Sequence, residues 1–189
     1  MKNKKIKILL ITIALLILIA ILILVIINNK KKEEKSEKDF IKSRIVELLE
    51  NNYKYYYYMY GDVNVEEGNI ENEDGKIYYI VNDDKLITPE ELTNIIEDTF
   101  LEEYIANRYN AEGRNEYIEF DGNIYVKKGE KVCKNIVEYD LSNIKYEFVD
   151  EKIIAYFGDN STYIYNDNGV WKQSVNVYYC ETETDEAEE

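Results

Sequence analysis

Carboxylates are the main residues that could carry chemistry in this 189-residue chain, because the sequence contains no histidine. That absence removes the commonest general base, the triads that depend on it, and most zinc sites. Asp and Glu total 38 residues, so a hydrolase with two catalytic acids stays open on counting alone. An EF-hand calcium loop does not fit, since Gly75 at the sixth position would put Ile70 and Val81 at the first and twelfth.

The two cysteines offer little chemistry of their own. Cys133 and Cys180 match no metal-binding spacing, and a cysteine nucleophile would lack its histidine partner. A disulfide and a pair of buried thiols both remain open. We therefore predict a non-catalytic protein with no catalytic residue, no metal and no cofactor.

The N-terminal part of the chain contains an apolar run from Ile8 to Ile27 with Thr12 as its only polar residue. A helix of that length spans roughly 30 Å, the thickness of a bilayer core, which predicts a transmembrane helix. A cleaved signal peptide is the alternative, but Asn28 and Asn29 follow the run instead of a small-residue cleavage site. We expect a single-pass signal anchor with its N-terminus inside and its domain outside the cell.

Charge separates the rest of the chain from this segment. Residues 39–189 hold 35 acidic and 14 basic residues, a net charge of −21, which disfavours nucleic-acid binding and favours a cationic partner surface. The predicted organisation is a tail and transmembrane helix at 1–29, a charged linker at 30–38, an acidic domain at 39–180 and a disordered acidic tail at 181–189.

Two helices are predicted in the domain. Apolar residues recur at helical spacing from Ile41, and this first helix should end near Gly61. In its tyrosine run, residues 56 and 57 are expected to face the core and residues 55 and 58 to lie outside. Thr88, Pro89 and Glu91 form a helix-start signal, and the second helix should run to about Tyr109.

Strand signals make up most of the remaining domain. A hairpin is predicted within 62–81, and Asp121-Gly122 and Asn168-Gly169 are turn dipeptides between further strands of an antiparallel meander. These elements predict an α+β fold: an N-terminal transmembrane helix followed by two helices packed on one curved antiparallel sheet, like a cystatin-like or NTF2-like cone.

The order of these elements resembles the DL-endopeptidase inhibitor (IseA-like) family over about residues 40–171. Members are small extracytoplasmic bacterial proteins that block cell-wall endopeptidases with NlpC/P60-type catalytic domains. The matching positions are Tyr57-x-Met59-x-Gly61, Gly75-Lys76-x-Tyr78, Thr88-x-x-Glu91-Leu92 with Phe100 and Tyr104, Tyr117 through Asp121-Gly122-Asn123-x-Tyr125, and Gly169-Val170-Trp171-Lys172. The chain differs from the secreted inhibitors in its predicted anchor and its two cysteines.

The resemblance implies a bacterial cell-envelope protein that occludes the cleft of a cell-wall hydrolase with acidic, tyrosine-bearing loops. On this reading the partner has a basic surface, and charge would steer the encounter while aromatic rings add affinity. The predicted partner-binding residues are Tyr55, Tyr58, Asp62, Glu66, Glu67, Asp83 and Asp84. The alternative function is an NTF2-like scaffold or ligand-binding module, tethered to the membrane, with a ligand in the domain cavity.

Overall fold

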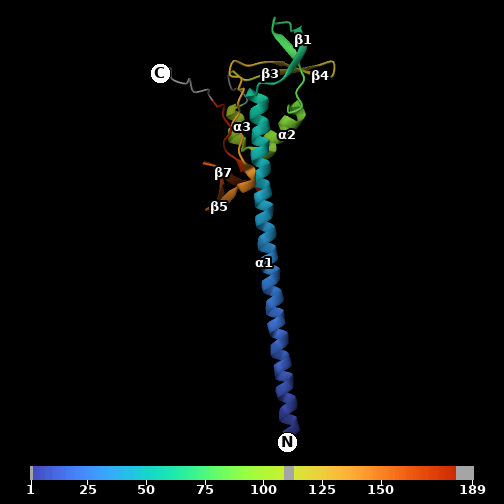
Figure 1. The fold of residues 1–189 in the computed structure, drawn as a ribbon, viewed down its shortest axis with the longest axis vertical. Coiled ribbons are helices and arrows are strands. Elements are labelled where there is room, and N and C mark those ends of the chain that lie inside the picture. Colours follow the sequence, from blue (N-terminus) through green and yellow to red (C-terminus); the bar gives the residue numbers. More distant parts are fainter. Residues whose placement is uncertain (1, 109–112, 182–189) are drawn as a thin grey trace, which may run out of the picture. The chain divides into compact units, whose positions relative to one another are not determined.

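The computed structural model describes residues 2–108 and 113–181, and it divides the chain into two compact units, Met1–Ser43 and Arg44–Glu189. Helix α1 (Lys2–Tyr60) supplies all of the described first unit and the beginning of the second (Figure 1). Residues 30–38, expected to form a linker, are helical and belong to α1. The predicted acidic tail lies, except for Glu181, outside the described residues.

The predicted transmembrane helix is contradicted. No helix in the described parts of the chain is both long enough and apolar enough to cross a membrane. Residues 8–27 are helical, and the side chains of 2–17 and of Ala20 lie outside the described part of the chain. The predictions of a signal anchor and of a single-pass plasma-membrane location are therefore corrected.

The second unit is α+β, as predicted at that level, but it contains two antiparallel sheets instead of one curved sheet. The first sheet has the order β1-β2-β4-β3 and the second the order β5-β6-β7-β8. The strands of the first are β1 (Val65–Glu71), β2 (Ile77–Val81), β3 (Glu116–Phe120) and β4 (Asn123–Lys127). Those of the second are β5 (Lys145–Val149), β6 (Lys152–Phe157), β7 (Asn160–Asp167) and β8 (Val170–Gln173).

The segment between β4 and β5 explains why the sheets are separate. Its backbone pairs with the end of α1, since the Cys133 amide donates to the Tyr60 carbonyl at 2.6 Å and the Cys133 carbonyl accepts from the Asp62 amide at 3.0 Å. A 3-10 helix, η1 (Leu141–Asn143), follows before β5 begins. With these hydrogen bonds made to the end of α1, the segment does not join the two sheets into one.

Local turn and capping signals are confirmed. Asp121 and Gly122 both have positive φ, as a type I′ turn requires, and they connect Phe120 to Asn123 in register. Asn168 and Gly169 do the same between β7 and β8. Helix α2 (Pro89–Thr99) begins with the expected capping box of Thr88 and Glu91.

The second predicted helix is interrupted where the sequence shows no break. Phe100 adopts an extended conformation, and the Leu101 amide donates to the Gln173 carbonyl at the end of β8 at 2.9 Å. Helix α3 (Glu102–Arg108) then resumes, and Tyr109, the predicted end, lies outside the described residues. The hydrogen bond from Leu101 to β8 therefore lies at a two-residue break between α2 and α3.

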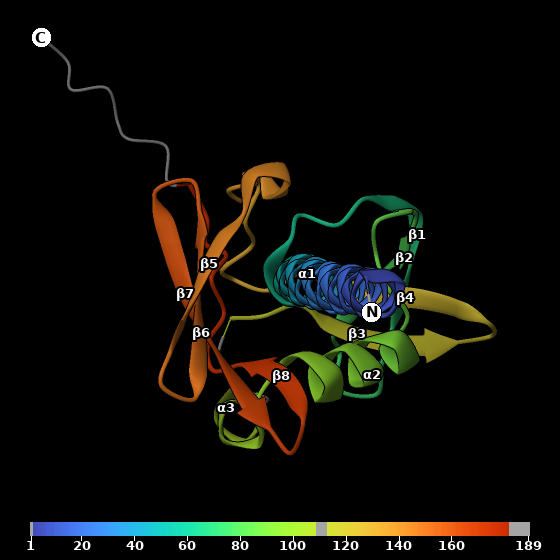
Figure 2. The same ribbon diagram turned by 90° about the horizontal axis from the view of Figure 1, so that it is seen from below.

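The part of α1 that belongs to the second unit contacts both sheets, which lie on different sides of it in the end-on view of Figure 2. The buried Asn52 side chain donates to Gln173 of β8 at 2.8 Å, and the Tyr58 ring lies 4.2 Å from the Tyr117 ring of β3. The main aromatic cluster comprises Tyr55, Tyr58, Met59, Leu92, Ile96, Phe100 and Tyr104. Side chains of this part of α1 thus contact both sheets.

Candidate functional site

Two of the predicted binding residues, Glu66 and Glu67, lie on the β1–β2 hairpin, which is rich in carboxylates. Residues 65–81 contain five carboxylates, all exposed, and one lysine. The acids are Glu66, Glu67, Glu71, Glu73 and Asp74. Lys76 is engaged elsewhere, in a 2.9 Å ion pair with Glu116 of β3. The predicted residues Glu66 and Glu67 therefore lie on a hairpin whose charge is largely uncompensated, on the edge strand β1.

Asp83 connects the base of this hairpin to α1. Its carboxylate accepts a 2.6 Å hydrogen bond from the Tyr57 hydroxyl and hydrogen bonds from the amides of Asn64 and Lys85 at 2.9 and 3.0 Å. Partial burial alone would raise the pKa of the Asp83 carboxyl, but these three donors outweigh it and hold the pKa below the ordinary value. Asp83 therefore positions the hairpin, while its neighbour Asp84 is exposed.

We expect Asp83→Asn to destabilise the protein by about 2 kcal/mol at pH 7, because the amide replaces a charged acceptor of three hydrogen bonds. Since the folded pKa is below the unfolded value of about 3.9, the stabilisation is present above that value and is lost as pH falls through the folded pKa. Urea unfolding at neutral and acid pH measures the difference, with the exposed Asp84→Asn as the matched control. A difference between wild type and Asp83→Asn that does not shrink in acid contradicts this role.

Asp62, another predicted residue, is half-buried and pairs with Lys128. An ion pair of this exposure contributes about 0–1 kcal/mol, so its carboxylate remains available to a stronger cationic partner.

The predicted orientation of the tyrosine run is wrong. Tyr55 is 4% exposed and Tyr58 is 6% exposed, whereas Tyr56 and Tyr57 are half-buried. The Tyr55 ring lies 5.1 Å from the Phe100 ring, and Tyr58 packs on Tyr117. Both side chains therefore belong to the core and do not offer a partner-binding surface.

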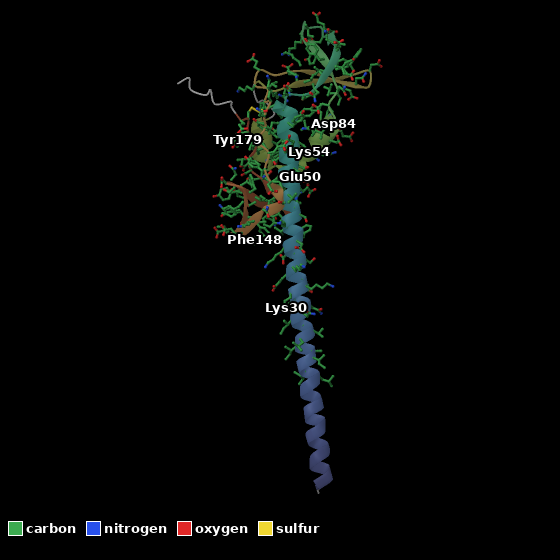
Figure 3. All side chains as sticks on the ribbon, viewed as in Figure 1. Lys30, Glu50, Lys54, Asp84, Phe148 and Tyr179 are labelled. Carbon is green, nitrogen blue, oxygen red and sulfur yellow. A yellow bond between two sulfur atoms is a disulfide. The ribbon has the colours of Figure 1, made fainter. Side chains whose placement is uncertain are left out.

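A tyrosine-lined groove on the second unit was missed by the sequence analysis. It has a volume of about 300 Å³, is open to solvent, and is lined by Glu50, Tyr53, Lys54, Glu138, Tyr139, Leu141 and Tyr178. The Tyr178 ring lies 5.2 Å from the Tyr53 ring and 5.1 Å from the Tyr139 ring. Glu50 and Lys54 lie one turn apart on α1 (Figure 3). We call this set of residues the tyrosine groove.

The disulfide positions one wall of the tyrosine groove. Cys133 and Cys180 are bonded across a sequence separation of 47 residues, which decides between the two alternatives left by the sequence. Beside the bond, the Val137 amide donates to the Tyr179 carbonyl at 3.1 Å and the Glu181 amide to the Asn135 carbonyl at 2.8 Å. Two segments far apart in the chain are thereby held side by side, which no local sequence pattern indicates.

The tyrosines of the groove are neutral hydrogen-bonding groups at physiological pH. Burial, together with the charge of Glu138, raises the pKa of the Tyr53 hydroxyl, and that hydroxyl donates to Glu138 at 3.3 Å. Burial also raises the pKa of Tyr139 and of Tyr178. None of these phenols is poised to act as a base.

The described residues form no cluster of metal-ligating side chains and include no buried carboxylate. Among residues 2–108 and 113–181, no group of three potential ligands from His, Cys, Asp and Glu comes together. The buried polar side chains in that part of the chain are Asn52, Thr99, Asn115, Thr162 and Gln173, with no carboxylate among them. A carboxyl group that serves as a general acid usually needs an environment that raises its pKa, such as burial.

Comparisons with protein-family models, with curated proteins and with solved structures found no match to this chain. The resemblance to DL-endopeptidase inhibitors, and the partner that it implies, therefore stay predictions.

Proposed function

We propose that this chain is a non-catalytic protein-binding domain that recognises a basic protein surface and blocks it. The observation that carries the proposal is the β1–β2 hairpin, where three exposed carboxylates lie on β1 and two more lie in the turn that follows it. They belong to a region with a net charge of −21. Such a field raises the encounter rate with a cationic surface and suppresses encounters with acidic ones.

The proposed partner is a cell-wall hydrolase with an NlpC/P60-type catalytic domain, and the proposed mode is occlusion of its active-site cleft. The motif resemblance supplies this class of partner. Two features support a blocking role: the chain has no histidine for a reaction of its own, and the base of the hairpin is held by Asp83 against Tyr57. A hairpin ordered before binding loses less conformational entropy when it enters a cleft.

The alternative role, a module with a ligand enclosed in the domain cavity, is less well supported. The apolar cavity within the aromatic cluster, between Met59, Leu92 and Phe100, measures about 20 Å³. That space holds about one water molecule, far below the volume of about 300 Å³ or more that a small-molecule site requires.

The test is inhibition of wall-peptide release by a panel of NlpC/P60 hydrolases, with the full-length chain added in increasing amounts. We expect at least one hydrolase to be inhibited at low ionic strength, with the inhibition weakening as salt is raised. Absence of both inhibition and binding across the panel at low salt contradicts the proposed partner. Peptide release by the chain alone contradicts its non-catalytic character.

A further inference from the structure

The tyrosine groove combines aromatic walls with carboxylates that have no cationic partner among the described residues. Glu50 and Glu138 line the groove, and neither forms an ion pair there, in contrast to Glu47, which pairs with Arg44 at 2.9 Å. Both residues line the groove together with Tyr178. Aromatic faces and carboxylates attract the same ligand, a cation.

We propose that the tyrosine groove binds a cationic side chain, an arginine or lysine, presented by the basic partner. This inference rests on the proposed function and adds to it a second contact site, distinct from the β1–β2 hairpin. Lys54 offsets one of the two negative charges at the groove, which leaves it acidic overall and unsuited to phosphate or carboxylate groups. The net charge of −21 in residues 39–189 adds attraction for the same ligand.

Hydrogen bonds within the protein hold the walls of the groove in place. The Asn52 side chain donates to the Val175 carbonyl at 3.1 Å, and the Tyr139 hydroxyl donates to the Val177 carbonyl at 3.1 Å. Together with the disulfide, these hydrogen bonds hold the segment that carries Tyr178 against α1. A cation can therefore bind against rings that are already in place, which limits the entropy lost on binding.

Arginine is the favoured occupant because its planar guanidinium stacks on aromatic rings and forms paired hydrogen bonds with carboxylates. The groove supplies both kinds of group in a volume of about 300 Å³. Citrulline has nearly the same shape but no charge, so it separates the electrostatic attraction from simple filling of the groove.

The experiment titrates N-acetyl-arginine amide into the full-length chain and follows the NMR signals of the tyrosine rings, with N-acetyl-citrulline amide as the matched ligand. We expect saturable shifts at Tyr53, Tyr139 and Tyr178 with arginine, and binding at least about tenfold weaker with citrulline. The double variant Glu50→Gln, Glu138→Gln should weaken arginine binding about tenfold or more. The control variant Glu151→Gln, Asp159→Asn removes two exposed carboxylates from turns of the second sheet. It should change the affinity for arginine by less than about twofold.

Equal binding of arginine and citrulline, or unchanged binding in the Glu50→Gln, Glu138→Gln variant, overturns the inference. Shifts confined to the β1–β2 hairpin also overturn it. These outcomes are separate from the hydrolase panel, because a chain that inhibits a hydrolase without binding arginine in the groove retains the proposed function and loses only this site. A chain that binds arginine in the groove but inhibits no hydrolase retains the site and loses the proposed target.

Discussion

Replacing Cys133 and Cys180 together by serine is expected to destabilise the second unit by about 4 kcal/mol. The disulfide closes a segment of 47 residues, and the entropy that such a cross-link removes from the unfolded chain accounts for a loss of that size. Urea unfolding followed through Trp171, the only tryptophan, measures it. Reductant should lower the unfolding midpoint of the wild type and leave the double-serine variant unaffected. A wild-type midpoint that does not respond to reductant contradicts the structural role of this bond.

The same substitution should also weaken arginine binding in the tyrosine groove. Without the bond, the backbone pairing of Val137 with Tyr179 loses its main constraint, and Glu138 is no longer held opposite Tyr53. This effect is measured on folded protein, in the absence of denaturant.

Phe100→Ala is expected to cost about 4 kcal/mol of stability. The Phe100 side chain is fully buried, and its ring lies 5.1 Å from the Tyr55 ring and 4.6 Å from the Tyr104 ring. Truncation removes the burial of a whole ring and leaves a cavity that its neighbours fill only in part. Equilibrium unfolding in urea gives the difference in free energy.

The control for this variant is Phe120→Ala, because the Phe120 side chain is 59% exposed at the end of β3. That substitution should change stability by less than about 1 kcal/mol. Equal losses in the two variants would contradict the placement of the core between α1 and α2.

Local signals in the sequence predicted local structure well. Thr88 and Glu91 form the capping box, and Asp121-Gly122 forms the turn of the hairpin, because each depends on residues a few positions apart. The acidic β1–β2 hairpin was predicted for the same reason. The break at Phe100 was not predictable, since it depends on a hydrogen bond to Gln173, more than 70 residues away in the chain.

The orientation of the tyrosine run shows how one polar residue can mislead a periodicity argument. The buried side of α1 in this part passes through Leu48, Leu49, Asn52, Tyr55 and Met59. If only apolar residues are counted, Asn52 is omitted, and Tyr53, Tyr56 and Tyr57 are assigned to the buried side of the helix instead. Asn52 is buried because its amide satisfies Gln173 and Val175, partners that come from the far end of the chain.

The tyrosine groove was beyond sequence reasoning for a related reason. Tyr53 is more than 80 residues from Glu138 and more than 120 from Tyr178, and the three meet only because the disulfide and Asn52 bring these segments together. The sequence left the disulfide as one of two alternatives, so it could not place the wall of the groove. The separation into two sheets likewise follows from the pairing of the Cys133 backbone with the end of α1.

The central claim, a non-catalytic domain that binds a basic partner through its acidic surface, is tested most directly by one kinetic measurement. It is the association rate constant between the full-length chain and an NlpC/P60 hydrolase, at ionic strengths of about 0.01 M and about 1 M, where the Debye length falls from about 30 to about 3 Å. We predict at least a tenfold decrease with salt, and a smaller decrease for the variant with Glu66, Glu67 and Glu71 changed to glutamine. A rate constant independent of salt, or identical in wild type and variant, would contradict the claim.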